Sequence, residues 1–148
     1  MSRPPVTGPG PGMGLLASGV IAAVTGGVVA ATLVCWGDSR VDITTYAGMV
    51  FFSVLIALFL GGLAAPPLAK WTIGGGSVSW VNSAITSTLT AALPATLFVL
   101  VRAPFINWGD ESFPIADTLN GLSMLALSGA GAGLVFRALY GARPIEPR

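Results

Sequence analysis

The sequence predicts an all-α polytopic membrane protein with four transmembrane helices in an antiparallel bundle. Three observations indicate this fold class. Hydrophobic residues make up 53% of the 148 residues and charged residues only 9%, against about 25% charged residues in soluble domains. Four apolar segments each reach about 20 residues, the length that a helix needs to cross a bilayer. The polar segments between them are short, so consecutive helices run antiparallel.

Composition also limits the function. The net charge is only +1, and nucleic-acid binding needs a basic stripe, so we expect no nucleic-acid partner. The chain has one cysteine and no histidine. An intrachain disulfide, a cysteine metal cluster, histidine-ligated haem and histidine acid–base catalysis are therefore excluded. We expect neither a metal nor another cofactor.

The first helix is predicted over residues 13–36, after a Pro- and Gly-rich segment over 1–12 that is typical of a disordered tail. The helical segment carries no charge and is longer than the apolar core of a secretory signal, about 7–15 residues. Small residues recur along it at every fourth position: Gly19, Ala23, Gly27 and Ala31. Such a row lets two backbones approach closely in a membrane, so we predict a helix-packing face.

The second helix is predicted over residues 46–65, after a short polar loop. Bulky apolar side chains surround it on all sides, which is typical of a helix that faces lipid or is buried. We expect lipid contact. Pro66 and Pro67 predict the end of this helix, and residues 68–77 are predicted to form a loop.

The third helix, predicted over residues 78–101, is the most polar of the four. Its hydroxyl residues are three or four positions apart and share one face, and Pro94 frees the carbonyl of Thr90. This candidate polar face consists of Ser79, Asn82, Ser83, Thr86, Thr90 and Pro94. It could line a polar path, or it could form hydrogen bonds to neighbouring helices and to its own backbone. We favour the second interpretation, because such residues more often bond in this way.

The fourth helix is predicted over residues 118–140 and completes a transmembrane domain over 13–141. A basic tail follows at 142–148. This helix contains a GxxxG pair within a row of small residues, which predicts a second helix-packing face. The glycines of this row are Gly121, Gly129 and Gly133.

A short motif occurs twice in the chain. Trp36-Gly37-Asp38 returns 72 positions later as Trp108-Gly109-Asp110. Each copy follows an odd-numbered predicted helix, which suggests a duplicated two-helix hairpin. Coincidence is the other interpretation, because the helices themselves barely match.

Acidic residues gather in the first and third predicted loops. They are Asp38, Asp42, Asp110, Glu111 and Asp117. They could attract cations to the mouth of a path, or they could be solvated loop residues, with Asp117 capping the fourth helix. We favour solvated loops, because no Asp, Glu or Lys falls within a predicted membrane helix, where a functional charge is expected.

One segment resembles a catalytic motif. Residues 113–117, Phe-Pro-Ile-Ala-Asp, look like the second aspartate motif of lipoprotein signal peptidases, which are four-helix membrane enzymes. That family has an earlier aspartate at the end of its third helix. Here the corresponding stretch, residues 100–104, reads Leu-Val-Arg-Ala-Pro. The sequence therefore does not support an aspartic catalytic dyad.

These observations predict a non-enzymatic, multi-pass inner-membrane protein that works through assembly. It would be an accessory or scaffolding subunit of a membrane complex, or a homo-oligomer, and would use the small-residue faces of the first and fourth helices. Its partners would be the lipid bilayer and other membrane subunits or itself. The alternative is a small channel or transporter for cations or small polar solutes, lined by the third helix. One Lys against six Arg suggests a GC-rich bacterial genome.

We predict that both termini are cytoplasmic. The tails and the middle loop carry five basic residues near helix ends, and the first and third loops carry two, and basic residues favour the cytoplasmic side. Reporter fusions at Arg148 and at Gly109 should therefore report opposite compartments. Export of the carboxyl-terminal reporter would contradict this topology.

Overall fold

The computed structural model describes residues 13–36, 40–74, 76–102 and 115–142. Within these ranges the chain forms five helices: α1 (Leu15–Cys35), α2 (Ile43–Leu63), α3 (Ala65–Ile73), α4 (Trp80–Arg102) and α5 (Ile115–Tyr140). Four of them, all except α3, are long and apolar enough to cross a membrane. The four long helices pack antiparallel, so the predicted all-α, four-span fold class is confirmed.

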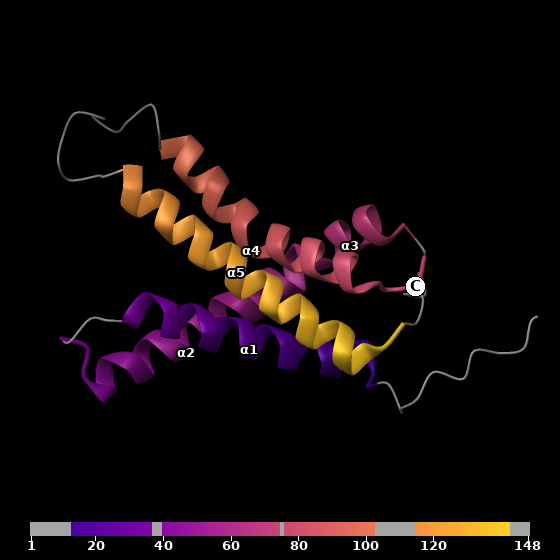
Figure 1. Cartoon of the computed structure of the whole chain (residues 1–148), viewed down its shortest axis with the longest axis horizontal. Coiled ribbons are helices and arrows are strands. Elements are labelled where there is room, and N and C mark those ends of the chain that lie inside the picture. Colours follow the sequence, from indigo (N-terminus) through magenta and orange to yellow (C-terminus); the bar gives the residue numbers. More distant parts are fainter. Residues whose placement is uncertain (1–12, 37–39, 75, 103–114, 143–148) are drawn as a thin grey trace, which may run out of the picture.

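The long helices pack side by side in the order α2, α1, α5, α4 (Figure 1). α1 packs on both α2 and α5, and α5 packs on α4, whereas α2 and α4 touch only slightly. Figure 1 shows two hairpins, α1 with α2 and α4 with α5, that lie together at one end and diverge at the other. The bundle is therefore an open series of helix pairs, with α1 and α5 inside and α2 and α4 outside.

The hydrophobic core lies at the end where the hairpins meet. Ile73, Val78 and Tyr140 form a buried cluster there, and the ring of Phe136 stacks on that of Tyr140 with 5.3 Å between the ring centroids. At the same end the backbone N–H of Met13 donates to the carbonyl of Leu139 over 3.0 Å. Residues from the starts of α1 and α4 and the ends of α3 and α5 thus come together at one end of the bundle.

α1 approaches its two neighbours closely because it carries glycines. A Cβ added to Gly27 would lie 2.7 Å from Cα of Val54 on α2. A Cβ added to Gly26 would lie 3.0 Å from Cβ of Ala132 on α5. Real Cβ atoms do not come as close to a backbone atom as the first of these distances, so the α1–α2 contact requires glycine at position 27.

α5 approaches α4 in the same way. A Cβ on Gly129 would lie 2.6 Å from the carbonyl oxygen of Ser87, and a Cβ on Gly133 would collide with the backbone of Ser83 and Ala84. The GxxxG pair thus faces α4 within the same chain.

The remaining residues of the two predicted packing faces do not all lie at a close helix contact. An added Cβ on Gly19 or on Gly121 would have no neighbour within 4 Å. Ala31 is buried and Ala23 is half-buried. The close contacts are therefore confined to part of each row, where the helix axes come nearest.

The loop predicted over residues 68–77 is wrong over its first part. α3 extends from Ala65 to Ile73 and ends at Gly74, which adopts a left-handed conformation with φ 57°. Pro66 and Pro67 lie in the first turn of this helix, where the backbone N–H groups have no intrahelical acceptor. The two prolines therefore begin a helix as well as following one.

We expect Gly129→Ala to destabilise the protein by about 1–3 kcal/mol, the usual cost of overpacking. The matched control is Gly131→Ala on the same helix, because a Cβ there meets nothing within 4 Å. Both changes improve helix propensity equally, so their difference isolates the collision with α4. Unfolding in mixed detergent measures both variants, and equal stabilities would contradict the close contact.

Candidate functional site

The polar face of α4 begins at the residue that caps the helix. The hydroxyl of Ser79 accepts a hydrogen bond from the backbone N–H of Asn82 over 3.0 Å, and the Ser79 carbonyl accepts from the N–H of Ser83. This is the geometry of an N-cap, which satisfies amide groups that lack an acceptor within the helix. Ser79 therefore starts α4.

Ser83 is buried at the contact between α4 and α5. Its side chain is 2% exposed, and its hydroxyl donates to the carbonyl of Gly133 over 2.6 Å. The missing side chain of Gly133 lets the two backbones come close enough for this bond. The hydroxyl of Thr88 makes a longer bond of 3.4 Å to the carbonyl of Ala126, also on α5.

Thr86 joins α4 to α3. Its hydroxyl lies 2.5 Å from that of Thr72 and within bonding distance of the Asn82 carbonyl, at 2.7 Å. Thr72 also reaches the carbonyl of Leu68 on its own helix, at 2.9 Å. The buried hydroxyl of Thr86 is therefore shared between the two helices.

Thr90 bonds to its own helix. It is 7% exposed, and its hydroxyl donates to the carbonyl of Thr86 over 2.8 Å. Pro94 lies one turn further on, inside α4, where its ring removes the N–H that would otherwise bond to the carbonyl of Thr90.

The structure brings Ser83, Thr86 and Thr90 together on one buried face, with Asn82 half-buried beside them. Each of the three hydroxyls has a protein partner on α3, α4 or α5. Hydroxyls that lined an aqueous path would face open space. The geometry therefore favours the interpretation that this face holds helices together.

Asp42 is the one member of the acidic set whose side chain lies within the described part of the chain. It is the N-cap of α2, and its carboxylate accepts from the backbone N–H of Thr45 over 2.8 Å. Hydrogen bonds from the side chain and backbone of Thr45 lower the pKa of Asp42, so the carboxylate stays ionised at neutral pH at the positive end of the helix. α2 therefore begins at Ile43, earlier than the predicted residue 46.

The other acidic residues receive no structural account. Asp38, Asp110 and Glu111 lie outside the described residues, as does the second copy of the repeated motif. Asp117 belongs to the first turn of α5, and its side chain is not described. The cation-attracting mouth and the duplicated hairpin remain predictions.

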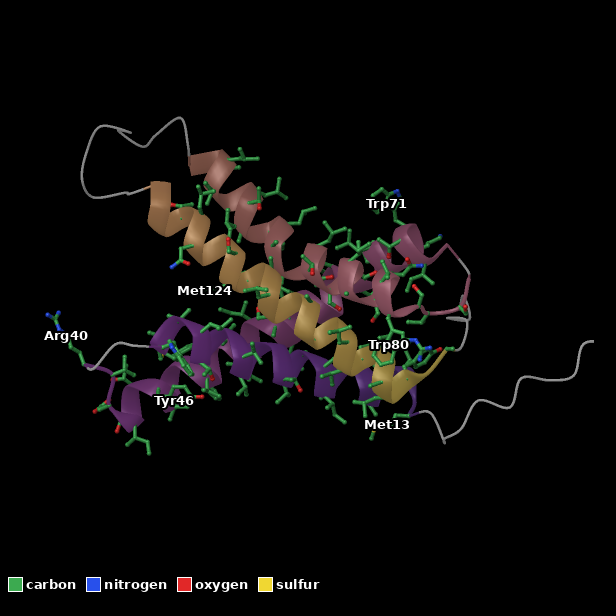
Figure 2. All side chains as sticks on the ribbon, in the orientation of Figure 1. Met13, Arg40, Tyr46, Trp71, Trp80 and Met124 are labelled. Carbon is green, nitrogen blue, oxygen red and sulfur yellow. The ribbon has the colours of Figure 1, made fainter. Side chains whose placement is uncertain are left out.

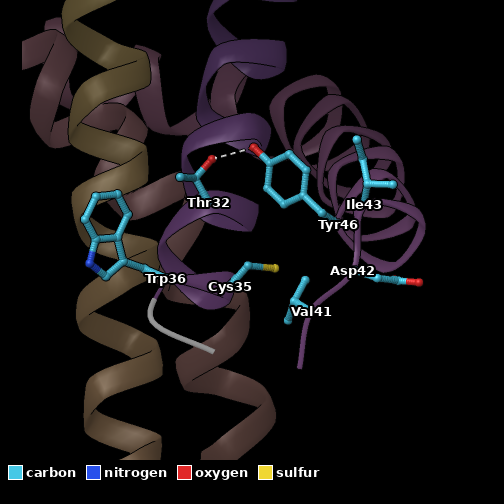
Figure 3. Close-up of a pocket in the computed structure, with 7 residues that line it drawn as sticks. All are labelled: Thr32, Cys35, Trp36, Val41, Asp42, Ile43 and Tyr46. Carbon is cyan, nitrogen blue, oxygen red and sulfur yellow. Dashed lines mark hydrogen bonds between the residues drawn. The ribbon is translucent and has the colours of Figure 1, made fainter. Parts of the chain in front are cut away.

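A hollow of about 370 Å³ lies between the end of α1 and the start of α2 (Figure 3). Thr32 and Tyr46 both line it, and their hydroxyl oxygens lie 2.8 Å apart in a hydrogen bond. Thr32 also donates to the carbonyl of Val28 over 2.8 Å, so the shared proton between the two hydroxyls comes from Tyr46. The thiol of Cys35 points toward the same space.

Sequence reasoning missed the partners in both places. The predicted loop over residues 68–77 includes Thr72, and the sequence pattern does not single out the Thr32–Tyr46 pair. A hydroxyl within an otherwise apolar membrane segment, as at Thr32, is the signal that could have found the pair, because such a group needs a partner.

Comparison with known proteins identifies no relative. No protein-family model matches the chain, and no curated protein or solved structure is significantly similar to it. Among the described residues, no three His, Cys, Asp or Glu side chains lie together as a metal site would need. The function must therefore be inferred from packing, hydrogen bonding and exposure.

We expect cysteines at positions 83, 86 and 90 to stay unreactive toward membrane-impermeant thiol reagents, after Cys35→Ala removes the native thiol. The reason is that all three native hydroxyls are buried against neighbouring helices. Ser77→Cys is the positive control, because Ser77 is exposed outside the helices. The reagent is added to inverted membrane vesicles, since the predicted topology puts Ser77 on the cytoplasmic side. Labelling of all three positions as fast as the control would show that water reaches this face.

Proposed function

We propose that this four-span membrane protein is a non-enzymatic assembly protein: an accessory or scaffolding subunit of a membrane complex, or a homo-oligomer. One observation carries the proposal. α2 is a full membrane span, yet none of its residues is buried within the chain. In an open series of helix pairs, such an outer helix has most of its surface available for lipid or for another transmembrane helix.

The surface that we assign to a partner differs from the one expected from sequence. The small-residue faces of α1 and α5 already contact helices of the same chain, at Gly27, Gly129 and Gly133. They leave little room for a second protein at those points. The expectation that these faces bind a partner is therefore replaced by a proposal for α2.

α2 presents an aromatic surface on its outer side. Phe51, Phe52 and Phe59 are each at least 60% exposed, and the rings of Phe51 and Phe52 meet edge to face with centroids 5.7 Å apart. Helix association in a membrane depends on van der Waals packing, and large rigid rings supply much contact area. These three side chains form the proposed partner surface.

Two further points support an assembly role over a transport role. The hydroxyls of α4 that would line a path are bonded to protein groups. Each of the four spans is apolar, and a charge inside a span, which pumps and ion-coupled transporters generally need, occurs only at Arg137 near the end of α5. The proposal locates the protein in an inner membrane, and the count of basic residues supports cytoplasmic termini.

Affinity purification of the full chain in mild detergent, followed by identification of what co-purifies, tests the proposal. We expect a stable hetero-complex or a defined homo-oligomer. The double change Phe52→Ala/Phe59→Ala should weaken it, because both rings belong to the proposed surface.

Leu127→Ala is the matched control, since Leu127 is 64% exposed on α5 and lies outside the proposed surface. Its complex should survive. A lone monomer from the unsubstituted protein, or a lone oligomer that conducts ions in liposomes, would overturn the assembly role.

A further inference from the structure

Arg137 is the only charged residue within the four membrane spans. It lies in the last turn of α5, and its guanidinium carbon is 5.1 Å from the centre of the Trp80 ring. Trp80 is the first residue of α4, and Figure 2 shows it beside the carboxyl-terminal end of α5. An arginine near the end of a span can reach the membrane interface, and ionisable groups in spans pair with one another or mark a site.

The Trp80 ring only partly meets that need. Its face attracts a cation, but its indole group accepts no hydrogen bond. Nε of Arg137 is buried and has no hydrogen-bond acceptor among the described residues. A buried charged donor without an acceptor is unfavourable, and an anionic oxygen is the kind of acceptor that Nε lacks.

The described surroundings offer no carboxylate to Arg137, whose nearest negative charge is the partial one at the carboxyl-terminal end of the α5 dipole. The other charges at this end of the bundle are positive. The start of α4 presents the positive end of a helix dipole. Lys70 lies on the last turn of α3, the helix whose Ile73 packs with Val78 and Tyr140 at this same end. Asp42, the described carboxylate, caps α2 at the opposite end of the bundle.

We propose that Arg137 and Trp80 form a binding site for the phosphate of an anionic phospholipid. Arg binds phosphate through two parallel N–H groups, and the end of a membrane span is where lipid phosphates lie. Trp80 is 50% exposed and its neighbour Val81 is 65% exposed. An acyl chain can therefore lie against these apolar surfaces while the phosphate reaches the guanidinium. This inference is independent of the proposed assembly role.

The test uses the full chain in a neutral detergent, titrated with phosphatidylglycerol or with phosphatidylcholine. Thermal unfolding and the binding of single lipids, seen by native mass spectrometry, are the two measurements. Phosphatidylglycerol should bind more tightly and raise the unfolding temperature further, because its net charge is negative. Equal binding of the two lipids would overturn the proposal.

Substitutions locate the site. Arg137→Gln should lower phosphatidylglycerol affinity about tenfold, the worth of one charge-assisted hydrogen bond. Arg137→Lys keeps the charge but loses the paired donors. Its phosphatidylglycerol affinity should therefore lie between those of the unsubstituted protein and Arg137→Gln. Lys70→Gln is the matched control for loss of a positive charge at the same end, and it should bind like the unsubstituted protein. An equal loss in Lys70→Gln and Arg137→Gln would overturn the assignment to Arg137.

Two further experiments test whether another anion, and not the lipid phosphate, is the ligand of Arg137. Inorganic phosphate alone should neither stabilise the protein nor displace the lipid, because it lacks the acyl chain; displacement would overturn the lipid assignment.

Glu146 in the carboxyl-terminal tail lies outside the described residues. Glu146→Gln should leave lipid affinity unchanged, and an increase would identify Glu146 as the counter-ion instead. The helix content of Arg137→Gln shows whether this variant folds. If it does not fold, the lipid affinity of Arg137→Lys is compared with that of the unsubstituted protein instead.

Discussion

The rest of the structure depends on the contact between α4 and α5 at Gly133. Its lack of a side chain brings the two backbones together, and the hydroxyl of Ser83 then reaches the carbonyl of Gly133 over 2.6 Å. In hydrocarbon no water can satisfy that hydroxyl, so the protein must do so. The small-residue pattern of one helix and the hydroxyl pattern of the other are therefore two sides of one interface. Neither pattern makes this contact alone.

The same logic orders the whole bundle. α5 presents Gly129 and Gly133 to α4 and Ala132 to α1. α1 presents Gly26 to α5 and Gly27 to α2. Helices with small residues on two sides can hold two close neighbours, so α1 and α5 lie inside. α2 is rich in bulky residues and packs closely on α1 alone, so it lies outside with its rings exposed. The distribution of side-chain size thus decides the order of the helices, since lipid gives no hydrophobic drive between them.

The sequence was sufficient for the spans, because length and apolarity alone determine which segments can cross a bilayer. It was insufficient for the contacts. A row of glycines identifies a helix face but not the point where a neighbour crosses it, so Gly133 meets a backbone while Gly121 meets nothing. A pair of prolines can follow one helix or begin the next, and the sequence alone did not decide this for α3. Without α3, the sequence could not predict Thr72 as the partner of Thr86, because Thr72 lies in the segment predicted to be a loop.

The two ends of the bundle are built differently, and this bears on how it would assemble. Where the hairpins meet, a buried cluster, a backbone hydrogen bond and the Arg137–Trp80 pair join α1, α3, α4 and α5. Away from that end, α2 is held to α1 by the Gly27 contact near the middle of both helices and by the Thr32–Tyr46 bond. α2 therefore has one close neighbour, and a partner that packed on its aromatic side would leave the α4–α5 contact intact. In the proposed assembly role, that separation would let α2 exchange lipid for a protein partner while the rest of the bundle keeps its fold.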